Sequence, residues 1–193
     1  MVKIFINNNR VHIDNKQAAL ILHSIIHKHM VKLKYRPDRK LIVVCVGTDR
    51  STGDSLGPLT GTFLKKYRPE RTTILGNINN PVHASNLESV IDKINSNYTK
   101  PFIIAVDAGL GKQSSVGYID VKKGPLQPGT GVNKKLPEIG DMHITGLVNV
   151  GGYMEYLVLQ STRLSLVMKM AKIIAEGLKL SIETFQKEES VID

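Results

Sequence analysis

The chain has 193 residues, 41% of them hydrophobic and 22% charged, which is typical of one globular domain and excludes collagenous, low-complexity and disordered chains. Lysine and arginine number 26 against 17 aspartates and glutamates, and the resulting net charge of +9 favours acidic partners through long-range attraction. Because the basic residues form no block and no aromatic stacking motif accompanies them, we expect no direct binding to nucleic acid.

The N-terminal part, residues 1–36, is expected to contain an edge strand or small hairpin followed by one helix. Apolar and polar residues alternate over residues 2–14, which predicts extended structure. Over residues 15–33, apolar residues recur at helical spacing, which predicts an amphipathic helix. His23 and His27 stand four residues apart on this helix, a spacing that can hold a metal. No acidic third ligand follows as in H-E-x-x-H, so a solvated basic face is favoured.

The core, residues 40–185, alternates strand patterns with helix patterns. The run LIVVCVG at residues 41–47 is continuously apolar, as in a strand that is buried on both faces. Further strands are expected over residues 72–75, 102–107, 116–121 and 143–151. Helices are expected over residues 54–67, 83–97 and 154–185. This alternation predicts a mostly parallel sheet covered on both faces, so residues 1–193 are expected to form a single three-layer α/β/α domain.

The sequence also predicts where the protein resides. No apolar run reaches the roughly 18 residues that a membrane-spanning helix needs. The N-terminus MVKIFINNNR lacks the apolar stretch of a signal peptide. We therefore expect a cytoplasmic protein without membrane association. Cys45, the single cysteine, lies inside LIVVCVG and is expected to be a buried core residue rather than a nucleophile.

Two acids occupy positions where parallel sheets bind ligands, beyond the carboxyl ends of the strands. Asp107 ends the strand FIIAV, and Asp54 follows LIVVCVG at the start of the next helix. If those strands are neighbours, the two carboxyl groups face one crevice. Two close carboxyl groups do not both ionise readily, so one would act as an acid and the other as a base that activates water against a peptide carbonyl. On spacing alone, structural roles are slightly favoured, with Asp54 as a helix N-cap and Asp107 as a turn former.

Other polar and glycine residues near the predicted strand ends are candidates for substrate binding, although turns, caps and surface loops use the same residue types. They are Asp49, Ser51, Thr52, His83, Asn86, Gly109, Gly129, Gly131, Lys134 and Lys135. The loop GTDRSTGDSLG lacks the lysine of a phosphate-binding loop, and no G-x-S-x-G motif occurs. We therefore expect neither a nucleotide nor any other cofactor, and no serine triad.

Five ordered segments carry a family resemblance: CVGTDRSTGDSLGP, VHASNLE, VDAGLG, PGTGVNKKLPEIGD and ITGLVNVGGYMEYLVLQSTRL. Together, over roughly residues 40–170, they resemble the YyaC-type sporulation proteins of endospore-forming bacteria. That family is similar, more distantly, to the germination protease that degrades small acid-soluble spore proteins. The germination protease pattern is matched here by DSLGP around Asp54, by IIAVDAG around Asp107 and by the loop PGTGVNKK.

The resemblance implies the phosphorylase/hydrolase-like α/β fold of the germination protease superfamily. It further implies an aspartate-dependent peptidase that acts on a spore protein or peptide through Asp54 and Asp107. The expected location is the cytoplasm of the sporulating cell or the spore interior, and a homo-oligomer is expected. An alternative is a non-catalytic sporulation factor that binds a peptide or protein partner in the same pocket.

A metal-assisted peptidase is the third interpretation, because hydrogenase maturation proteases belong to the same superfamily. In those proteins an acid at each of these two positions and a histidine in a later loop surround a metal. The corresponding loop here, PGTGVNKK, contains no histidine, and the nearby His143 is placed on the following strand. We therefore expect no metal.

Overall fold

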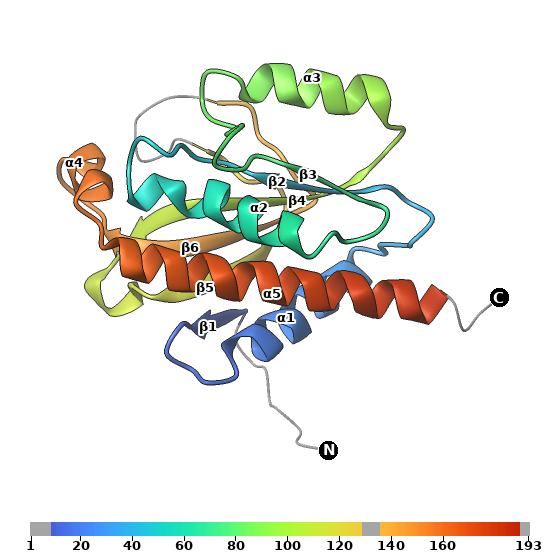
Figure 1. The fold of residues 1–193 in the computed structure, drawn as a ribbon, viewed down its shortest axis with the longest axis horizontal. Coiled ribbons are helices and arrows are strands. Elements are labelled where there is room, and N and C mark those ends of the chain that lie inside the picture. Colours follow the sequence, from blue (N-terminus) through green and yellow to red (C-terminus); the bar gives the residue numbers. More distant parts are fainter. Residues whose placement is uncertain (1–8, 129–135, 190–193) are drawn as a thin grey trace.

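The computed structural model of the protein describes residues 9–128 and 136–189, which form one six-stranded sheet in the order β1-β5-β6-β4-β2-β3 (Figure 1). The strands are β1 (Arg10–His12), β2 (Leu41–Cys45), β3 (Thr72–Leu75), β4 (Phe102–Gly111), β5 (Tyr118–Lys123) and β6 (Met142–Val150). The strands β3, β2, β4 and β6 run parallel, whereas β5 is antiparallel to β6 and β1 is antiparallel to β5. The predicted mostly parallel sheet is confirmed.

The helices cover both faces of this sheet. They are α1 (Ala18–Lys32), α2 (Leu56–Lys66), α3 (Leu87–Asn97), α4 (Glu155–Gln160) and α5 (Leu164–Glu189). Helices α1, α2 and α5 pack on one face, around the larger apolar core, and α3 packs on the other face, around a smaller core (Figure 1). The three-layer α/β/α prediction is therefore confirmed. Among the described residues, no helix combines the length and apolar character needed to cross a membrane.

Strand β4 is longer than the sequence predicts. The expected strand ended at Asp107, but β4 continues to Gly111 because β6 stays paired with it as far as Val150. On its other side, β2 ends at Cys45, which lies opposite Val106. Asp107 is therefore the first residue of β4 after the last pairing with β2, where the sheet narrows and leaves room for a pocket.

The single helix expected over residues 154–185 is in fact two helices, α4 and α5. The helix breaks where side chains, rather than a backbone N–H four residues later, donate hydrogen bonds to a backbone carbonyl. The Val158 carbonyl accepts hydrogen bonds from Asn149 Nδ2 at 3.2 Å and from Thr162 Oγ1 at 2.8 Å, and the Thr162 N–H donates instead to the Leu159 carbonyl. The chain turns here, so α4 lies at the end of the sheet beyond β6 (Figure 1).

The predicted amphipathic helix is confirmed as α1, but its histidines do not form a solvated basic face. The His23 ring nitrogen Nδ1 lies 3.1 Å from Ser181 Oγ of α5, and the His27 ring stacks on Phe185 with the ring centres 4.7 Å apart. His29 is buried, with 8% of its surface exposed. His23 and His27 therefore help to pack α1 against α5.

The packing of these histidines predicts that acid weakens the fold. Burial lowers the pKa of both His23 and His29. The neighbouring His27 lowers the pKa of His23 further. A lowered pKa in the folded chain means that the unfolded chain binds more protons as the pH falls below about 6.5, so stability is full above that pH and is lost below it. We expect the melting temperature to fall between pH 7 and pH 5. The fall should be smaller in a His23→Gln, His29→Gln variant; an unchanged profile would contradict this role.

Two glycines allow α2 to lie directly on the sheet. A side chain on Gly57 would collide with the Val46 carbonyl, and one on Gly61 would collide with the Gly76 carbonyl. Both glycines lie on the same face of α2, four residues apart, so the helix closely approaches the backbone just after β2 and just after β3. This approach places Asp54, which comes just before α2, over the end of β2.

Gly57→Ala is expected to destabilise the protein by about 1–3 kcal/mol, because the added methyl group forces backbone apart. Glycine-to-alanine changes that cause no collision normally stabilise a protein by about 0.4–1 kcal/mol, so the expected sign is reversed. Denaturant unfolding would measure the effect, with Ser89→Ala at an exposed position of α3 as a control that stays near the wild type. A Gly57→Ala protein that is as stable as the wild type would refute the close approach.

Candidate active site

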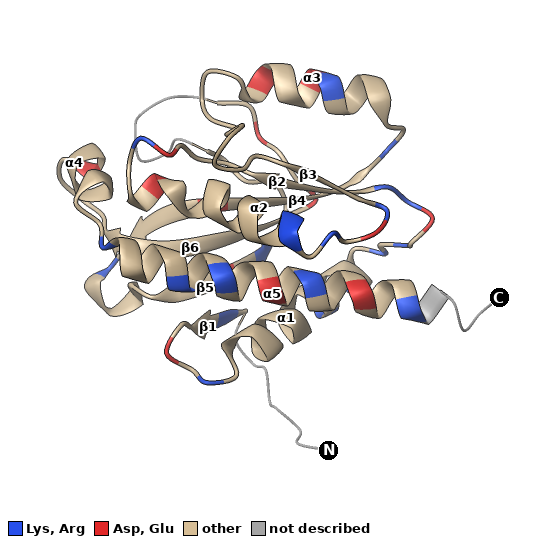
Figure 2. Ribbon diagram, in the orientation of Figure 1, with Lys and Arg blue, Asp and Glu red and all other residues tan. Residues whose placement is uncertain are grey.

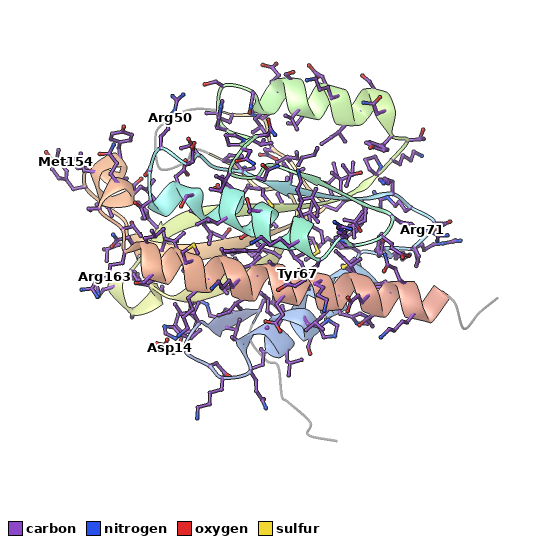
Figure 3. The ribbon with its side chains drawn as sticks, in the orientation of Figure 1. Asp14, Arg50, Tyr67, Arg71, Met154 and Arg163 are labelled. Atoms are coloured by element: carbon purple, nitrogen blue, oxygen red, sulfur yellow. The ribbon has the colours of Figure 1, made fainter. Side chains whose placement is uncertain are left out.

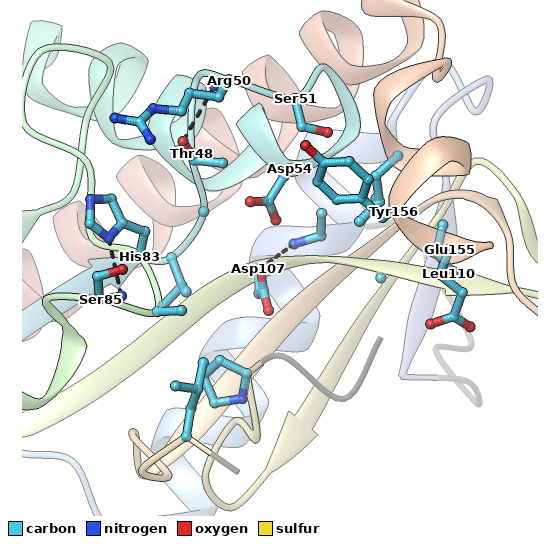
Figure 4. A pocket seen from close by; sticks show the side chains of 18 residues that line it. Thr48, Arg50, Ser51, Asp54, His83, Ser85, Asp107, Leu110, Glu155 and Tyr156 are labelled. Carbon is cyan, nitrogen blue, oxygen red and sulfur yellow. Dashed lines mark hydrogen bonds between the residues drawn. The ribbon is translucent and has the colours of Figure 1, made fainter. Parts of the chain in front are cut away.

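A pocket of about 530 Å³ opens at the carboxyl-terminal edge of the parallel strands (Figure 4). It is lined by the loop that follows β2, the turn that precedes α3, the middle of β4 and the helix α4. Both predicted acids, Asp54 and Asp107, line it. The pocket therefore lies where ligands bind in open parallel sheets.

Asp107 is the more deeply buried of the two acids, with 8% of its surface exposed. Its carboxyl oxygen Oδ1 accepts a hydrogen bond of 2.8 Å from the backbone N–H of Ala108. Burial raises the pKa of Asp107 well above its usual value, and the negative charge of Asp54 raises it further. Asp107 is therefore the carboxyl group of the pair that holds a proton more strongly.

Asp54 is half-buried and lies in a short 3-10 turn, Gly53–Ser55, at the start of α2. Its backbone carbonyl accepts a hydrogen bond from the Thr48 N–H at 3.1 Å, which closes the loop over the end of β2. Burial raises the pKa of the Asp54 carboxyl, whereas the Thr48 backbone and His83 oppose the rise. No ion pair with lysine or arginine reaches Asp54 or Asp107 within residues 9–128 and 136–189.

The electrostatics of the pair separate two roles. The negative charge of Asp54 disfavours ionisation of Asp107, so the two carboxyl groups do not readily ionise together. Asp107 is the more buried, and its pKa is raised further above the usual value than that of Asp54, which favours the protonated form of Asp107. Such a pair provides one acid and one base in the same pocket.

Three of the other predicted site residues also line the pocket: Ser51, His83 and Gly109. Ser51 is buried, with 8% of its surface exposed, and its hydroxyl has no hydrogen-bond partner among the described residues. The His83 Nδ1 atom accepts a hydrogen bond of 3.3 Å from the Ser85 N–H (Figure 4). A buried hydroxyl without a partner can donate a hydrogen bond to a ligand in the pocket.

The side chains of Asp49, Thr52 and Asn86 do not line the pocket. The Thr52 carbonyl accepts a hydrogen bond of 2.6 Å from the Ser55 hydroxyl, so this residue shapes the turn before α2. Asn86 Oδ1 accepts a hydrogen bond of 2.8 Å from the His83 N–H and holds a turn, which is why α3 begins at Leu87 rather than at His83. The remaining predicted residues lie outside the described part of the chain: Gly129, Gly131, Lys134 and Lys135.

Helix α4 contributes pocket residues that the sequence analysis did not identify: Glu155, Tyr156 and Leu159. Arg50 and Leu110 also line the pocket without having been predicted (Figure 4). The sequence contained a signal that could have predicted the role of α4. The segment after β6 leaves the same edge of the sheet as the loop that follows β2, where ligands bind. This signal was missed because a single helix was expected over residues 154–185.

The described residues form no three-ligand group for a metal. Asp54, His83, Asp107 and Glu155 are the acidic and histidine residues that line the pocket, but within residues 9–128 and 136–189 no three His, Cys, Asp or Glu residues are grouped to hold an ion. His143 is placed on β6, as expected, and its Nδ1 lies 2.9 Å from the Gly124 carbonyl. Cys45 is fully buried in β2, which raises the pKa of its thiol to about 12 and agrees with the predicted core role.

Comparisons with known proteins identify a family, a relative and a structure with a similar fold. Residues 10–177 match the family described as "Protein of unknown function (DUF1256)". The chain is 50% identical over 172 residues to "Uncharacterized protein YyaC" of Bacillus subtilis (strain 168), and the match covers 89% of this chain and 82% of the relative. The structure is similar, with a TM-score of 0.58 and 17% identity, to the NiFe hydrogenase maturation protease HycI from Thermococcus kodakarensis KOD1, covering 82% of this chain and 99% of that one. At this identity the likeness shows a common fold.

Proposed function

The chain belongs to the DUF1256 family, and we propose that it is an aspartate-dependent peptidase whose active site is the pocket around Asp54 and Asp107. The observation that carries this proposal is the electrostatic pairing of two carboxyl groups in one pocket, with both pKa values raised. Perturbed pKa values of this kind are typical of catalytic acids and bases. The likeness in fold to a hydrogenase maturation protease supports a peptidase.

In the proposed reaction, Asp54 removes a proton from a water molecule, and the water oxygen attacks the carbonyl carbon of a peptide bond. Asp107 donates its proton to the carbonyl oxygen, which produces a neutral tetrahedral intermediate. As the C–N bond breaks, Asp54 passes its proton to the leaving nitrogen, and the intermediate returns the other proton to Asp107. Two fragments with a new carboxyl and a new amino terminus leave, and the pair regains its starting state.

Neighbouring groups would position the substrate in this reaction. The Ser51 hydroxyl has no partner among the described residues, so it can donate a hydrogen bond to the substrate carbonyl. His83 and Gly109 line the same pocket and would contact the substrate chain. No step is assigned to a metal, because the described residues do not form a three-ligand group.

The substrate class is proposed from the resemblance to sporulation proteins. A spore protein or peptide would be the substrate, in the cytoplasm of the sporulating cell or the spore interior, and the protein would assemble into a homo-oligomer. The basic net charge of +9 favours an acidic substrate. In the view of Figure 2, lysine and arginine are spread over α5 and several loops and form no single block along the chain, which supports a protein substrate over nucleic acid.

The proposal is tested by incubating the purified protein with small acid-soluble spore proteins and with an unbiased peptide library in water enriched in ¹⁸O. Mass spectrometry is expected to detect new fragments whose carboxyl termini contain ¹⁸O, because water supplies the attacking oxygen. Cleavage should persist in a chelator. Activity that a chelator abolishes and added metal restores would contradict the metal-free mechanism, and a lack of cleavage of every substrate would contradict the peptidase.

A second candidate function is peptide or protein binding without cleavage in the same pocket. It is favoured by Tyr156, which lines the pocket and yet has 61% of its surface exposed, as in a recognition surface. Binding of an intact sporulation protein that remains uncleaved over many hours would support this function and exclude the peptidase for that partner.

A further inference from the structure

Large apolar side chains are exposed together on and just before α4. Tyr153 is 85% exposed, Met154 is 55% exposed, Tyr156 is 61% exposed and Leu157 is 46% exposed. We call these four residues the α4 surface. No residue of α4 is buried, although the helix has the apolar sequence EYLVLQ. An exposed apolar patch of this kind marks a binding site in a folded protein.

The α4 surface is held in place although it is exposed. Asn149 Nδ2 donates hydrogen bonds to the Val158 carbonyl and to Thr162 Oγ1, each at 3.2 Å. Glu155 Oε1 accepts a hydrogen bond of 3.2 Å from the Gly152 N–H. The side chains before and within α4 are therefore presented from a fixed backbone, which lowers the entropy that binding costs.

The backbone at the start of α4 adopts an unfavourable conformation. Met154 has a φ of 50° and a ψ of 47°, in the left-handed region that residues other than glycine rarely occupy. The Met154 side chain extends outward at the edge of the molecule (Figure 3). Such a conformation persists where the surrounding structure imposes it.

The α4 surface is continuous with the pocket. Tyr156 belongs to both, and the next turn of α4 adds Leu159 to the pocket wall. In Figure 4, Tyr156 lies beside Asp54 at the pocket. A chain bound on the α4 surface would therefore continue directly past the two carboxyl groups.

We propose that the α4 surface binds an apolar segment of an unfolded polypeptide substrate and thereby places the adjoining peptide bond at Asp54 and Asp107. This inference rests on the proposed peptidase function and adds to it the class of substrate. The occupant is apolar because Glu155 is the single charged residue between Asn149 and Gln160. A second copy docked on the α4 surface would cover Tyr156 at the pocket and obstruct entry, whereas a substrate segment uses both surfaces together.

The test measures binding in the absence of cleavage. The probe is fluorescein-labelled, reduced and carboxymethylated α-lactalbumin, a chain that stays unfolded, and fluorescence anisotropy reports its binding to the full-length Asp107→Asn protein. Adding Tyr153→Ser and Leu157→Ser should weaken binding by about tenfold or more, since buried aromatic and aliphatic anchors dominate such contacts. The matched control adds Tyr67→Ser and Leu20→Ser, which remove the same residue types at exposed positions outside the pocket.

The control variant should bind the probe within about twofold of the Asp107→Asn parent, because its substitutions lie outside the α4 surface and the pocket. Neither the α4 variant nor the control variant changes the net charge of the parent, so charge does not explain a difference between them. Equal loss of binding in both variants, or no loss in the α4 variant, would overturn the inference. Sedimentation velocity adds a further outcome: if the parent protein is a dimer and the α4 variant is a monomer, the surface belongs to a second copy and the inference fails. Strong probe binding by a wild-type protein that cleaves no peptide would refute the peptidase while leaving the docking surface supported.

Discussion

Asp107→Asn is expected to lower kcat/KM for peptide cleavage by about 100- to 10,000-fold, the usual contribution of a general acid. Asparagine keeps the size of the side chain and can still accept the hydrogen bond from the Ala108 N–H through Oδ1. It has no proton of comparable acidity to give to the carbonyl oxygen. Asp54→Asn should reduce cleavage by a similar factor, because an amide does not accept the proton of the attacking water.

The two losses should not multiply. Asp54 and Asp107 act on the same proton-transfer sequence, so the double variant is expected to be about as inactive as either single variant. Asp92→Asn removes the same charge from an exposed position of α3 outside the pocket and should retain full kcat/KM. If Asp54→Asn and Asp107→Asn both cleave at the wild-type rate, the two acids have no catalytic role.

Asp107→Asn is also expected to raise the melting temperature at pH 7. The raised pKa of Asp107 means that its carboxyl ionises more readily in the unfolded chain than in the folded one. Ionisation therefore favours unfolding at neutral pH, and asparagine, which does not ionise, removes this effect. We therefore expect Asp107→Asn to melt at a higher temperature than the wild type in thermal unfolding at pH 7.

The pH dependence of this gain has a defined sign. Asp107 has a raised pKa in the folded protein, so its stabilising contribution is complete below the unfolded value of about 3.9 and is lost as the pH rises through the folded value. The difference in melting temperature between Asp107→Asn and the wild type should therefore be small near pH 4 and grow toward pH 7. Calorimetry across this range would measure it.

Asp141→Asn provides a comparison with the opposite sign. Asp141 Oδ2 accepts a hydrogen bond of 2.8 Å from the Ile103 N–H, and Oδ1 lies 3.3 Å from Arg39. Removing this charge weakens favourable contacts, so the melting temperature should fall. If Asp107→Asn lowers the melting temperature as Asp141→Asn does, Asp107 is a structural aspartate, and the raised pKa on which the proposed acid pair depends is refuted.

The strands of the sheet could be predicted well from the sequence, because their apolar runs are long and clear turns separate successive elements along the chain. LIVVCVG identified β2, and the alternation of strand and helix identified the parallel core. The length of β4 was not predictable in the same way. Its continuation past Asp107 depends on pairing with β6, a contact between segments far apart in the chain. The division of α4 from α5 likewise depends on Asn149.

The candidate site was predicted in part, because strand ends can be read from a sequence and side-chain directions cannot. Strand-end reasoning brought Asp54 and Asp107 to one crevice and placed His83 near it. It did not distinguish Ser51, which faces the pocket, from Asp49 in the same loop, which does not line it. Tyr156 was missed because the turn after β6 brings its helix, α4, to the pocket, and this turn was not predicted.

The most direct test of the acid pair is a titration of the aspartate carboxyl groups by ¹³C NMR, with the Asp107 signal assigned by its loss in Asp107→Asn. Asp107 is predicted to keep its proton far above the ordinary aspartate pKa of about 3.9. In Asp54→Asn, its pKa should fall, because the neighbouring negative charge is removed. An Asp107 that titrates near its ordinary value, and does so unchanged in Asp54→Asn, would contradict the shared-proton mechanism.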